Sequence, residues 1–151
     1  MIVRQRGFTL VELITVMILL GILAAVAIPR MMGNTGMAST SFRADVVSAL
    51  RYAQKTAVSH RRLVCATVST NVVALAIASG NPATDCNEPF ASPDGTPYAS
   101  RDAAIVAGGL LGKLFFQPNG TITNANGVVS GSITVTNEGA VRLDGLTGHV
   151  E

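Results

Sequence analysis

One carboxylate stands inside the most apolar stretch of this chain. Between Phe8 and Ile28 the only ionisable side chain is that of Glu12. As a helix this stretch would span roughly 31 Å at about 1.5 Å per residue, which is one crossing of a lipid bilayer. A carboxylate costs about 2.5 to 3.5 kcal/mol near the centre of such a helix and less near the interface. Glu12 is therefore expected to need a partner.

Cleavage of the backbone would supply such a partner. The chain begins Met-Ile-Val-Arg-Gln-Arg-Gly, and a cut between Gly7 and Phe8 would create an α-amino group one helical turn before Glu12. A secretory signal peptide is the competing interpretation, since a basic start, an apolar core and small residues such as Ala24 and Ala25 would suit it. The acid inside the apolar stretch argues against a signal peptide.

The other residues that could do chemistry do not form a catalytic or metal-binding pattern. His60 has no second histidine, cysteine or carboxylate at metal-ligand spacing. His149 is one candidate base among loops, and no nucleophile with a nearby base or pair of carboxylates can be assembled. We expect no enzymatic activity, no metal and no cofactor.

The start of the chain resembles a known family. The run Arg-Gly-Phe-Thr-Leu-Val-Glu-Leu at residues 6–13, followed by an apolar helix and Pro29, is similar to type IV prepilins and type II secretion pseudopilins. The resemblance implies a filament subunit. The alternative, a plain membrane anchor with an accidental glutamate, would leave the whole run unexplained.

The resemblance assigns a role to each matching residue. Prepilin peptidase would cut after Gly7 and methylate the new N-terminal Phe8. Glu12 would direct assembly by docking the subunit to the filament end, and Pro29 would kink the helix. The implied partners are prepilin peptidase, the inner-membrane assembly platform and other pilin subunits.

Charge flanking the apolar stretch sets the expected topology. Arg4 and Arg6 precede the stretch, and positive residues at a first apolar helix favour keeping that end in the cytoplasm. The rest of the chain would face the periplasm from a single-pass anchor in the bacterial inner membrane, and later reside in a pilus or pseudopilus. Removing both arginines with the leader brings the formal charge of +2 to zero.

The expected organisation has four parts: a cytoplasmic leader at 1–7, a transmembrane and assembly helix at 8–29, an amphipathic second half of that helix at 30–60, and a periplasmic β-sheet domain at 61–151. Pro29 and the glycines at 33 and 36 weaken a helix, so we expect it to kink or loosen there. The apolar stripe beyond this point must be covered by another layer. Its members are Phe42, Val46, Ala49, Leu50, Ala53 and Ala57.

The helix is expected to end near Ser59 or His60, and β-structure follows. Residues 63–78 predict two strands with a turn near 69–71, and 79–112 predict a long irregular region rich in proline and glycine. Strands are expected again at 113–116, 131–136 and 140–144, as a hairpin or meander. The fold class is therefore α+β, and the resemblance implies the type IV pilin fold, a long N-terminal helix packed on a small antiparallel sheet.

Two cysteines, Cys65 and Cys86, fall on the first predicted strand and in the irregular region. In a periplasmic chain a pair of cysteines favours a disulfide over a free buried thiol or a reactive one. Closing this loop would stabilise the fold by roughly 3 kcal/mol and fix the proline-rich region against the sheet.

The order of elements narrows the resemblance to the GspH/FimT branch of minor pilins and pseudopilins. The helix-to-hairpin join at 49–62 is similar to a minor pilin of mannose-sensitive haemagglutinin (MSHA) pili. The expected function is a minor pilin that initiates or modifies a type IV pilus. The alternatives are a minor pseudopilin of a type II secretion system and, less favoured, a DNA- or ligand-binding subunit at the pilus tip.

Two observations bear on nucleic acid as a partner. DNA-binding members of the FimT group carry Gly-Arg-x-Arg near the C-terminus, where this chain has Gly-His-Val-Glu at 148–151. Losing two phosphate contacts lowers affinity for DNA. The basic residues Arg51, Lys55 and 60–62 are interpreted as a solvated helix face and as favourable charge at the helix C-terminus. Nucleic acid is therefore an unlikely partner.

Overall fold

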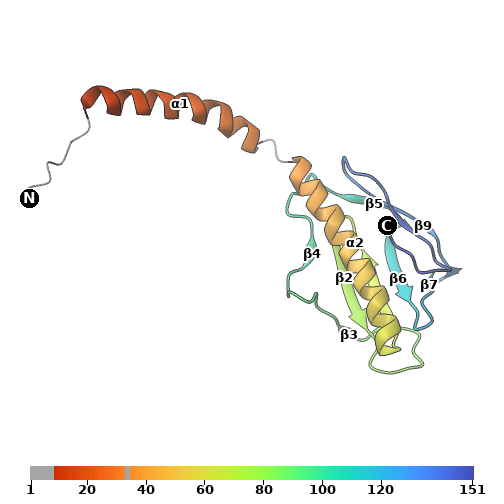
Figure 1. Cartoon of the computed structure of the whole chain (residues 1–151). Coiled ribbons are helices and arrows are strands. Elements are labelled where there is room, and N and C mark those ends of the chain that lie inside the picture. The colour runs from red at the N-terminus through yellow and green to blue at the C-terminus, as the bar shows by residue number, and fades with distance from the viewer. Residues whose placement is uncertain (1–8, 33–34) are drawn as a thin grey trace, which may run out of the picture. The chain divides into compact units, whose positions relative to one another are not determined.

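A computed structural model describes residues 9–32 and 35–151, and the side chains at 9–26 and 36–151. The chain divides into two compact units, with the boundary between Asn34 and Thr35, and each is described by itself. The predicted cleavage residues Gly7 and Phe8 lie outside the described residues (Figure 1). The division of the predicted helix at 29/30 and the kink at Pro29 remain predictions.

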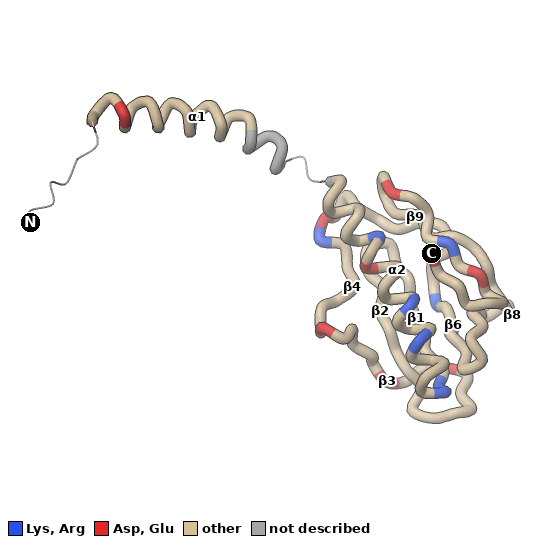
Figure 2. The backbone as a smooth tube through the Cα atoms, in the orientation of Figure 1, with Lys and Arg blue, Asp and Glu red and all other residues tan. Residues whose placement is uncertain are grey.

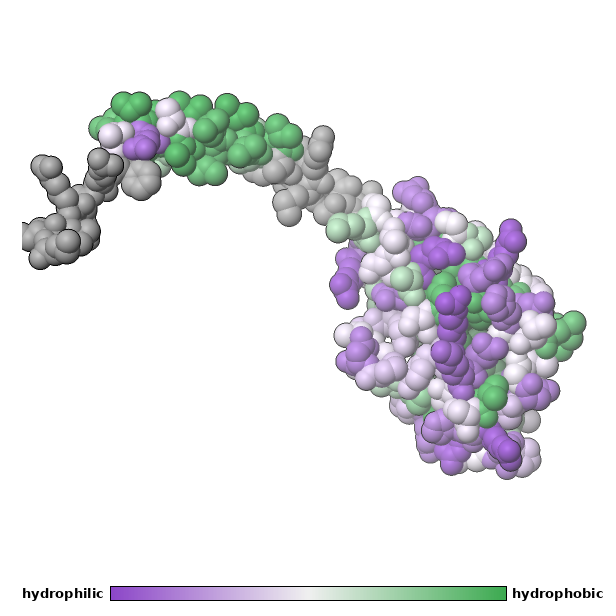
Figure 3. All heavy atoms as spheres, in the orientation of Figure 1, coloured by the Kyte–Doolittle hydropathy of each residue, from purple (hydrophilic) through white to green (hydrophobic). Residues whose placement is uncertain are grey.

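The first unit contains the helix α1 (Leu10–Met32). Every side chain of α1 described up to Val26 is exposed, including large apolar ones such as Leu10 (73%) and Leu23 (65%). The described part of the helix is hydrophobic along almost its whole visible length (Figure 3). Among the residues described, no helix combines the length and the apolar character that crossing a membrane requires.

The second unit is organised around the helix α2 (Thr35–His60), and the predicted stripe on this helix is confirmed. All six apolar residues of that stripe are at most 1% exposed. The helix ends as expected at His60, where Arg61 adopts a left-handed φ of 51°. The N–H of Arg61 donates to the carbonyl of Val58, and that of Arg62 to the carbonyl of Ala57. This pair of bonds is a Schellman motif, which satisfies carbonyls at the end of a helix.

Within residues 35–151, ten short strands form two antiparallel sheets. The larger sheet has the order β3-β2-β1-β6-β7-β8, with β4 also beside β2, and the smaller has the order β10-β9-β5. The larger sheet contains β1 (Val64–Val68), β2 (Val72–Ile77), β3 (Glu88–Pro89), β4 (Tyr98–Ala99), β6 (Gly112–Phe116), β7 (Ile122–Asn124) and β8 (Gly127–Val128). The smaller contains β5 (Ala107–Gly109), β9 (Gly131–Val135) and β10 (Val141–Leu143).

The strands expected from the sequence are present, but their arrangement differs from a single meander. The first hairpin pairs β1 with β2 from Val64 opposite Ile77 to Val68 opposite Val73. After β6, the hairpin β7–β8 extends the larger sheet, and β9 and β10 then form the second sheet with β5. The hairpin β7–β8 was not predicted, because its strands are only three and two residues long.

One core joins α2 to both sheets. Phe42 and Leu50 of α2 lie in the same buried cluster as Phe116 of the larger sheet and Ile133 of the smaller. The α2 helix lies across the strands in Figure 1. An antiparallel sheet can leave one face to solvent when a helix covers the other. The predicted layer over the α2 stripe is therefore supplied by two sheets.

The turn between β9 and β10 fixes the start of α2. Glu138 accepts hydrogen bonds from the hydroxyls of Ser39 (3.2 Å) and Thr40 (2.6 Å). Arg43 donates from Nε to the carbonyl of Gly139 at 2.8 Å. These contacts join residues about a hundred positions apart in the sequence and hold the first turns of α2 to the turn between β9 and β10.

Candidate functional site

The predicted assembly residue Glu12 lies in the first turn of α1, where it forms a reciprocal cap with Thr9. The backbone N–H of Glu12 donates to the Thr9 hydroxyl oxygen at 3.2 Å. The Thr9 backbone N–H and hydroxyl donate back to Glu12 Oε2 at 3.3 Å and 3.2 Å. This arrangement is a capping box, with Thr9 as the N-cap and Glu12 three residues later.

The capping box changes the interpretation of Glu12. An acid in the first turn is stabilised by the helix dipole, and here it also satisfies a backbone donor that the helix leaves free. The partner that the carboxylate was expected to need is thus found within the same helix. Thr9 was missed as this partner, although the spacing Thr-x-x-Glu before an apolar run is itself a capping signature.

The predicted pair Cys65 and Cys86 forms a disulfide, with the Cα atoms 6.0 Å apart. Cys65 is 1% exposed on β1 and packs with Leu63 and Ala78, while Cys86 lies in the irregular region and is half-buried. The bond therefore ties this region to the central strand of the larger sheet. The prediction of a disulfide is confirmed.

An ion pair lies beside the disulfide. Asp85 accepts a hydrogen bond from Lys113 and another from the backbone N–H of Cys86. Both bonds lower the pKa of Asp85 below its usual value, and the bond from Lys113 has the larger effect. Asp85, Cys65 and Cys86 are the one group of three potential metal ligands within the described ranges. Because the two sulfurs are bonded to each other, neither offers the thiolate that binds metals.

The irregular region is ordered by contacts with α2 and β2, and it is called the framed loop below. Phe90 stacks on Tyr52 of α2 with ring centroids 5.0 Å apart and planes inclined by 12°. Its backbone N–H also donates to the carbonyl of Leu75 at 3.0 Å. Further along, Asp94 accepts bonds from the N–H and hydroxyl of Thr96. These contacts hold the loop beside α2.

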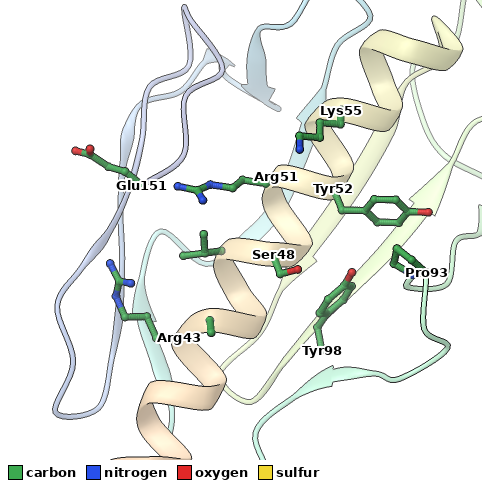
Figure 4. A pocket seen from close by; sticks show the side chains of 10 residues that line it. Arg43, Ser48, Arg51, Tyr52, Lys55, Pro93, Tyr98 and Glu151 are labelled. Atoms are coloured by element: carbon green, nitrogen blue, oxygen red, sulfur yellow. The ribbon is translucent and has the colours of Figure 1, made fainter.

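A groove of about 570 Å³ runs along the solvent-facing side of α2, between this loop and the C-terminal residues. Among its lining residues, Figure 4 shows Arg43, Arg51 and Lys55 on one side of α2 and Tyr52 and Tyr98 on the other. The lysine and arginine positions along α2 are also visible in Figure 2. Sequence reasoning identified two of these cations but not the groove, because its walls come from three separate segments.

The C-terminal residues form the far side of this groove. Val150 pairs with Leu143 of β10, and the backbones of Arg142 and Glu151 exchange hydrogen bonds of 2.8 Å and 3.0 Å. The carbonyl of Val150 also accepts a bond from Nε of Arg51 at 2.9 Å. The segment at 148–151, where the DNA-binding arginines of the FimT group would stand, thus extends the smaller sheet.

Both histidines considered as candidate functional residues are exposed, and His149 adjoins Glu151 of the groove lining. His60 is the exposed last residue of α2, and His149 is exposed with Nε2 3.7 Å from Oε2 of Glu151. His149 lines a second groove of about 600 Å³ beside β9 and β10. The structure does not bring these histidines together.

Comparison with known proteins finds similarities that include the N-terminal region. Residues 2–28 match the prokaryotic N-terminal methylation motif. The chain is 49% identical over 47 residues to type II secretion system core protein G of Klebsiella pneumoniae, covering 31% of each protein. It is 32% identical over 92 residues to the type IV narrow pilus major component PilA5 of Thermus thermophilus, covering 61% of this chain and 63% of that protein.

The fold has a counterpart of known structure. The crystal structure of the type IV minor pilin FimU of Pseudomonas aeruginosa matches with a TM-score of 0.51 and 19% identity, covering 80% of this chain and 89% of that one. The expected type IV pilin fold is therefore confirmed. The sequence matches relate the chain to type IV pilins and type II secretion pseudopilins, although it spans less than a third of the length of the first curated relative. The narrower resemblance to MSHA pili stays a prediction.

Proposed function

We propose that this protein is a minor pilin of a type IV pilus, processed at its N-terminus and assembled through α1. The observation that carries the proposal is the methylation motif at 2–28, which runs into a helix whose described apolar side chains are exposed in the subunit. An apolar surface of this size requires lipid or other subunits to cover it. Successive burial in the membrane and in a filament would provide both.

Processing follows from the motif. Prepilin peptidase cleaves between Gly7 and Phe8 and methylates the Phe8 amine, and the inner-membrane assembly platform then receives the subunit. Arg4 and Arg6 keep the leader in the cytoplasm, so that the unit Thr35–Glu151 lies in the periplasm before assembly. This proposal gives the globular unit a structural role and no catalytic one.

Glu12 has one set of partners in the single subunit and another in the filament. In the single subunit its carboxylate accepts bonds from Thr9 of its own helix. In the filament the Phe8 amine of a neighbouring subunit is a cation that this carboxylate attracts. Docking therefore exchanges or supplements one set of hydrogen bonds with another, and draws the subunit into register with its neighbour.

A type II secretion pseudopilus is the second candidate, and a specific observation favours it. The 49% identity over 47 residues is with a core protein of that system. The two candidates share cleavage, methylation and assembly, and differ in the filament that receives the subunit. Co-purification with surface pili or with the secretion apparatus distinguishes them.

The proposal is tested by mass and by incorporation. Protein from native membranes should have the intact mass of a chain that begins at N-methylated Phe8. Sheared filaments are then compared with membranes for wild type, Glu12→Ala, Glu12→Asp and Glu12→Gln. Detection by antibody is preferable to a C-terminal tag, because the Glu151 backbone is paired with β10.

The glutamine variant is the matched control, because glutamine can replace glutamate in a capping box without carrying its charge. We expect cleavage of all four proteins, reduced incorporation of the alanine and glutamine variants, and an intermediate level for aspartate. Normal incorporation of Glu12→Gln together with poor incorporation of Glu12→Ala would assign Glu12 to capping alone. An uncleaved chain in cells with active prepilin peptidase would refute the proposed function.

A further inference from the structure

We infer that the groove along α2 is a docking site for an acidic, extended segment of a partner protein. The inference rests on the proposed function only for the identity of that partner, which would be another filament subunit. The groove belongs wholly to the unit Thr35–Glu151. Its chemistry can therefore be tested without assembling a filament.

The cationic wall is preorganised. Arg43, Arg51 and Lys55 follow one another at intervals of eight and four residues, and Figure 4 shows them on one side of α2. Nε of Arg43 is held by the carbonyl of Gly139 at 2.8 Å, and Nε of Arg51 by the carbonyl of Val150 at 2.9 Å. A guanidinium carries five N–H groups in a planar fork, so each arginine has further donors. Anchoring through Nε lowers the entropy cost of presenting them to a carboxylate.

The opposite wall is aromatic. Tyr52 is fixed by stacking on Phe90, and Tyr98 and Pro93 continue the wall along the framed loop (Figure 4). Ala44, Val47 and Ser48 of α2 also line the groove. Paired tyrosines and arginines are the composition of binding hot spots between proteins. A ligand that fits both walls has carboxylates on one side and apolar groups on the other.

The dimensions suit a short extended peptide. The interval from Arg43 to Lys55 rises about 18 Å along the helix at about 1.5 Å per residue. An extended chain covers that length with five or six residues at about 3.3 Å each. Alternating side chains of such a segment would face the two walls in turn.

The groove suits a mixed acidic and apolar segment better than a polyanion. Two of its three cations already donate from Nε to backbone carbonyls, which leaves fewer donors for closely spaced phosphates. Its other wall is aromatic and can take apolar side chains. Glu151 also lines the groove, but its carboxylate points away from α2 in Figure 4, with Oε2 3.7 Å from Nε2 of His149.

The test uses the full mature chain in detergent and intrinsic fluorescence. Both tyrosines of the protein, Tyr52 and Tyr98, line the groove, and the chain contains no tryptophan. The probe is the peptide acetyl-Glu-Leu-Glu-Pro-Glu-Leu-amide. Its matched control has glutamine at each glutamate, and a twelve-nucleotide oligothymidylate represents nucleic acid.

Lys55→Gln is the informative variant, because Lys55 is exposed at the end of the cationic wall. Arg62→Gln removes a cation outside the groove lining and serves as its control. We expect the acidic peptide to bind, to weaken about two- to fivefold with Lys55→Gln, as an exposed ion pair would imply, and to be unaffected by Arg62→Gln. Tyr98→Ala should weaken both peptides.

Each other outcome counts against the inference. Equal binding of the acidic and glutamine peptides, or equal effects of the two cation variants, would show that the groove does not recognise acids. Tighter binding of the oligonucleotide than of the acidic peptide would assign the groove to nucleic acid. Normal filament incorporation together with no peptide binding would overturn this inference and leave the proposed function standing.

Discussion

Breaking the bond between Cys65 and Cys86 should lower the stability of the globular unit by about 3 kcal/mol while leaving its native fold in place. The change is Cys86→Ser, made on the half-buried partner so that the buried Cys65 stays as a small thiol within its cluster. The disulfide closes a loop with a sequence separation of 21. Loop-closure entropy for that length gives roughly 3 kcal/mol near 25 °C.

The native loop has other anchors, which is why we expect the fold to survive. Strands β3 and β4 both pair with β2, and Asn81 donates from its side chain to the carbonyl of Arg61 at 2.8 Å. Ser100 donates from its backbone N–H to the carbonyl of Asn71 at 2.8 Å. The loss should therefore appear in the free energy of unfolding and not as a disordered loop in the native state.

The assay is urea unfolding of the full chain in detergent, followed by circular dichroism and by tyrosine fluorescence. The two probes should give one transition, shifted to lower urea in Cys86→Ser. Wild type treated with a reductant is the control and should unfold together with the variant. A loss below about 1 kcal/mol in both would refute the chain-entropy reasoning. Native-state tyrosine spectra that differ between variant and wild type would show that the loop depends on the disulfide for its structure.

Three further predictions concern single residues of the globular unit. Gly148→Ala should lower the free energy of unfolding in urea by at least about 2 kcal/mol, because at its φ of +69° a Cβ would overlap the carbonyl oxygen of Gly120. Gly95→Ala is the control: its φ is +74°, but a Cβ there would meet open space, so the loss should be about 1 kcal/mol. Glu138→Ala should speed hydrogen exchange in the first turns of α2, since the Ser39 and Thr40 hydroxyls lose their contact with the β9–β10 turn and keep only the carbonyl of Gly36 as acceptor. Glu138→Gln should do so less. Because folding lowers the pKa of Asp85, its carboxylate stabilises the folded state above about pH 4, and this stabilisation is lost as the pH falls through the pKa of the folded state. The melting temperatures of wild type and Asp85→Asn should therefore converge on acidification. A difference that stays constant with pH would contradict this expectation.

The helix and the first hairpin were predictable because their signals are local. The spacing of Phe42, Val46 and Leu50 requires one buried face, and the structure buries all three. Alternating β-branched residues likewise place the turn between β1 and β2. The cysteine pairing was also accessible, since two cysteines allow only one intramolecular bond.

The two-sheet arrangement and the groove could not be derived in the same way. Strand β5 pairs with β9 across more than twenty residues, and no local pattern in a short glycine-rich strand specifies that partner. The groove combines α2, the framed loop and the C-terminal segment. Its cations looked like a solvated face in the sequence, because a helix pattern says which residues are exposed and not what stands beside them.

The capping box limits how much energy Glu12 can contribute to assembly. If the carboxylate were unsatisfied in the single subunit, docking would recover the full cost of an isolated charge near lipid, which is about 2.5 to 3.5 kcal/mol. Because Thr9 already donates two hydrogen bonds to it, docking recovers only the difference between two satisfied states. A small difference can set register between helices, but it cannot distinguish one subunit from another that carries the same motif. Selection of neighbours must then come from surfaces that differ between subunits, and the groove on α2 provides such a surface outside the shared N-terminal helix.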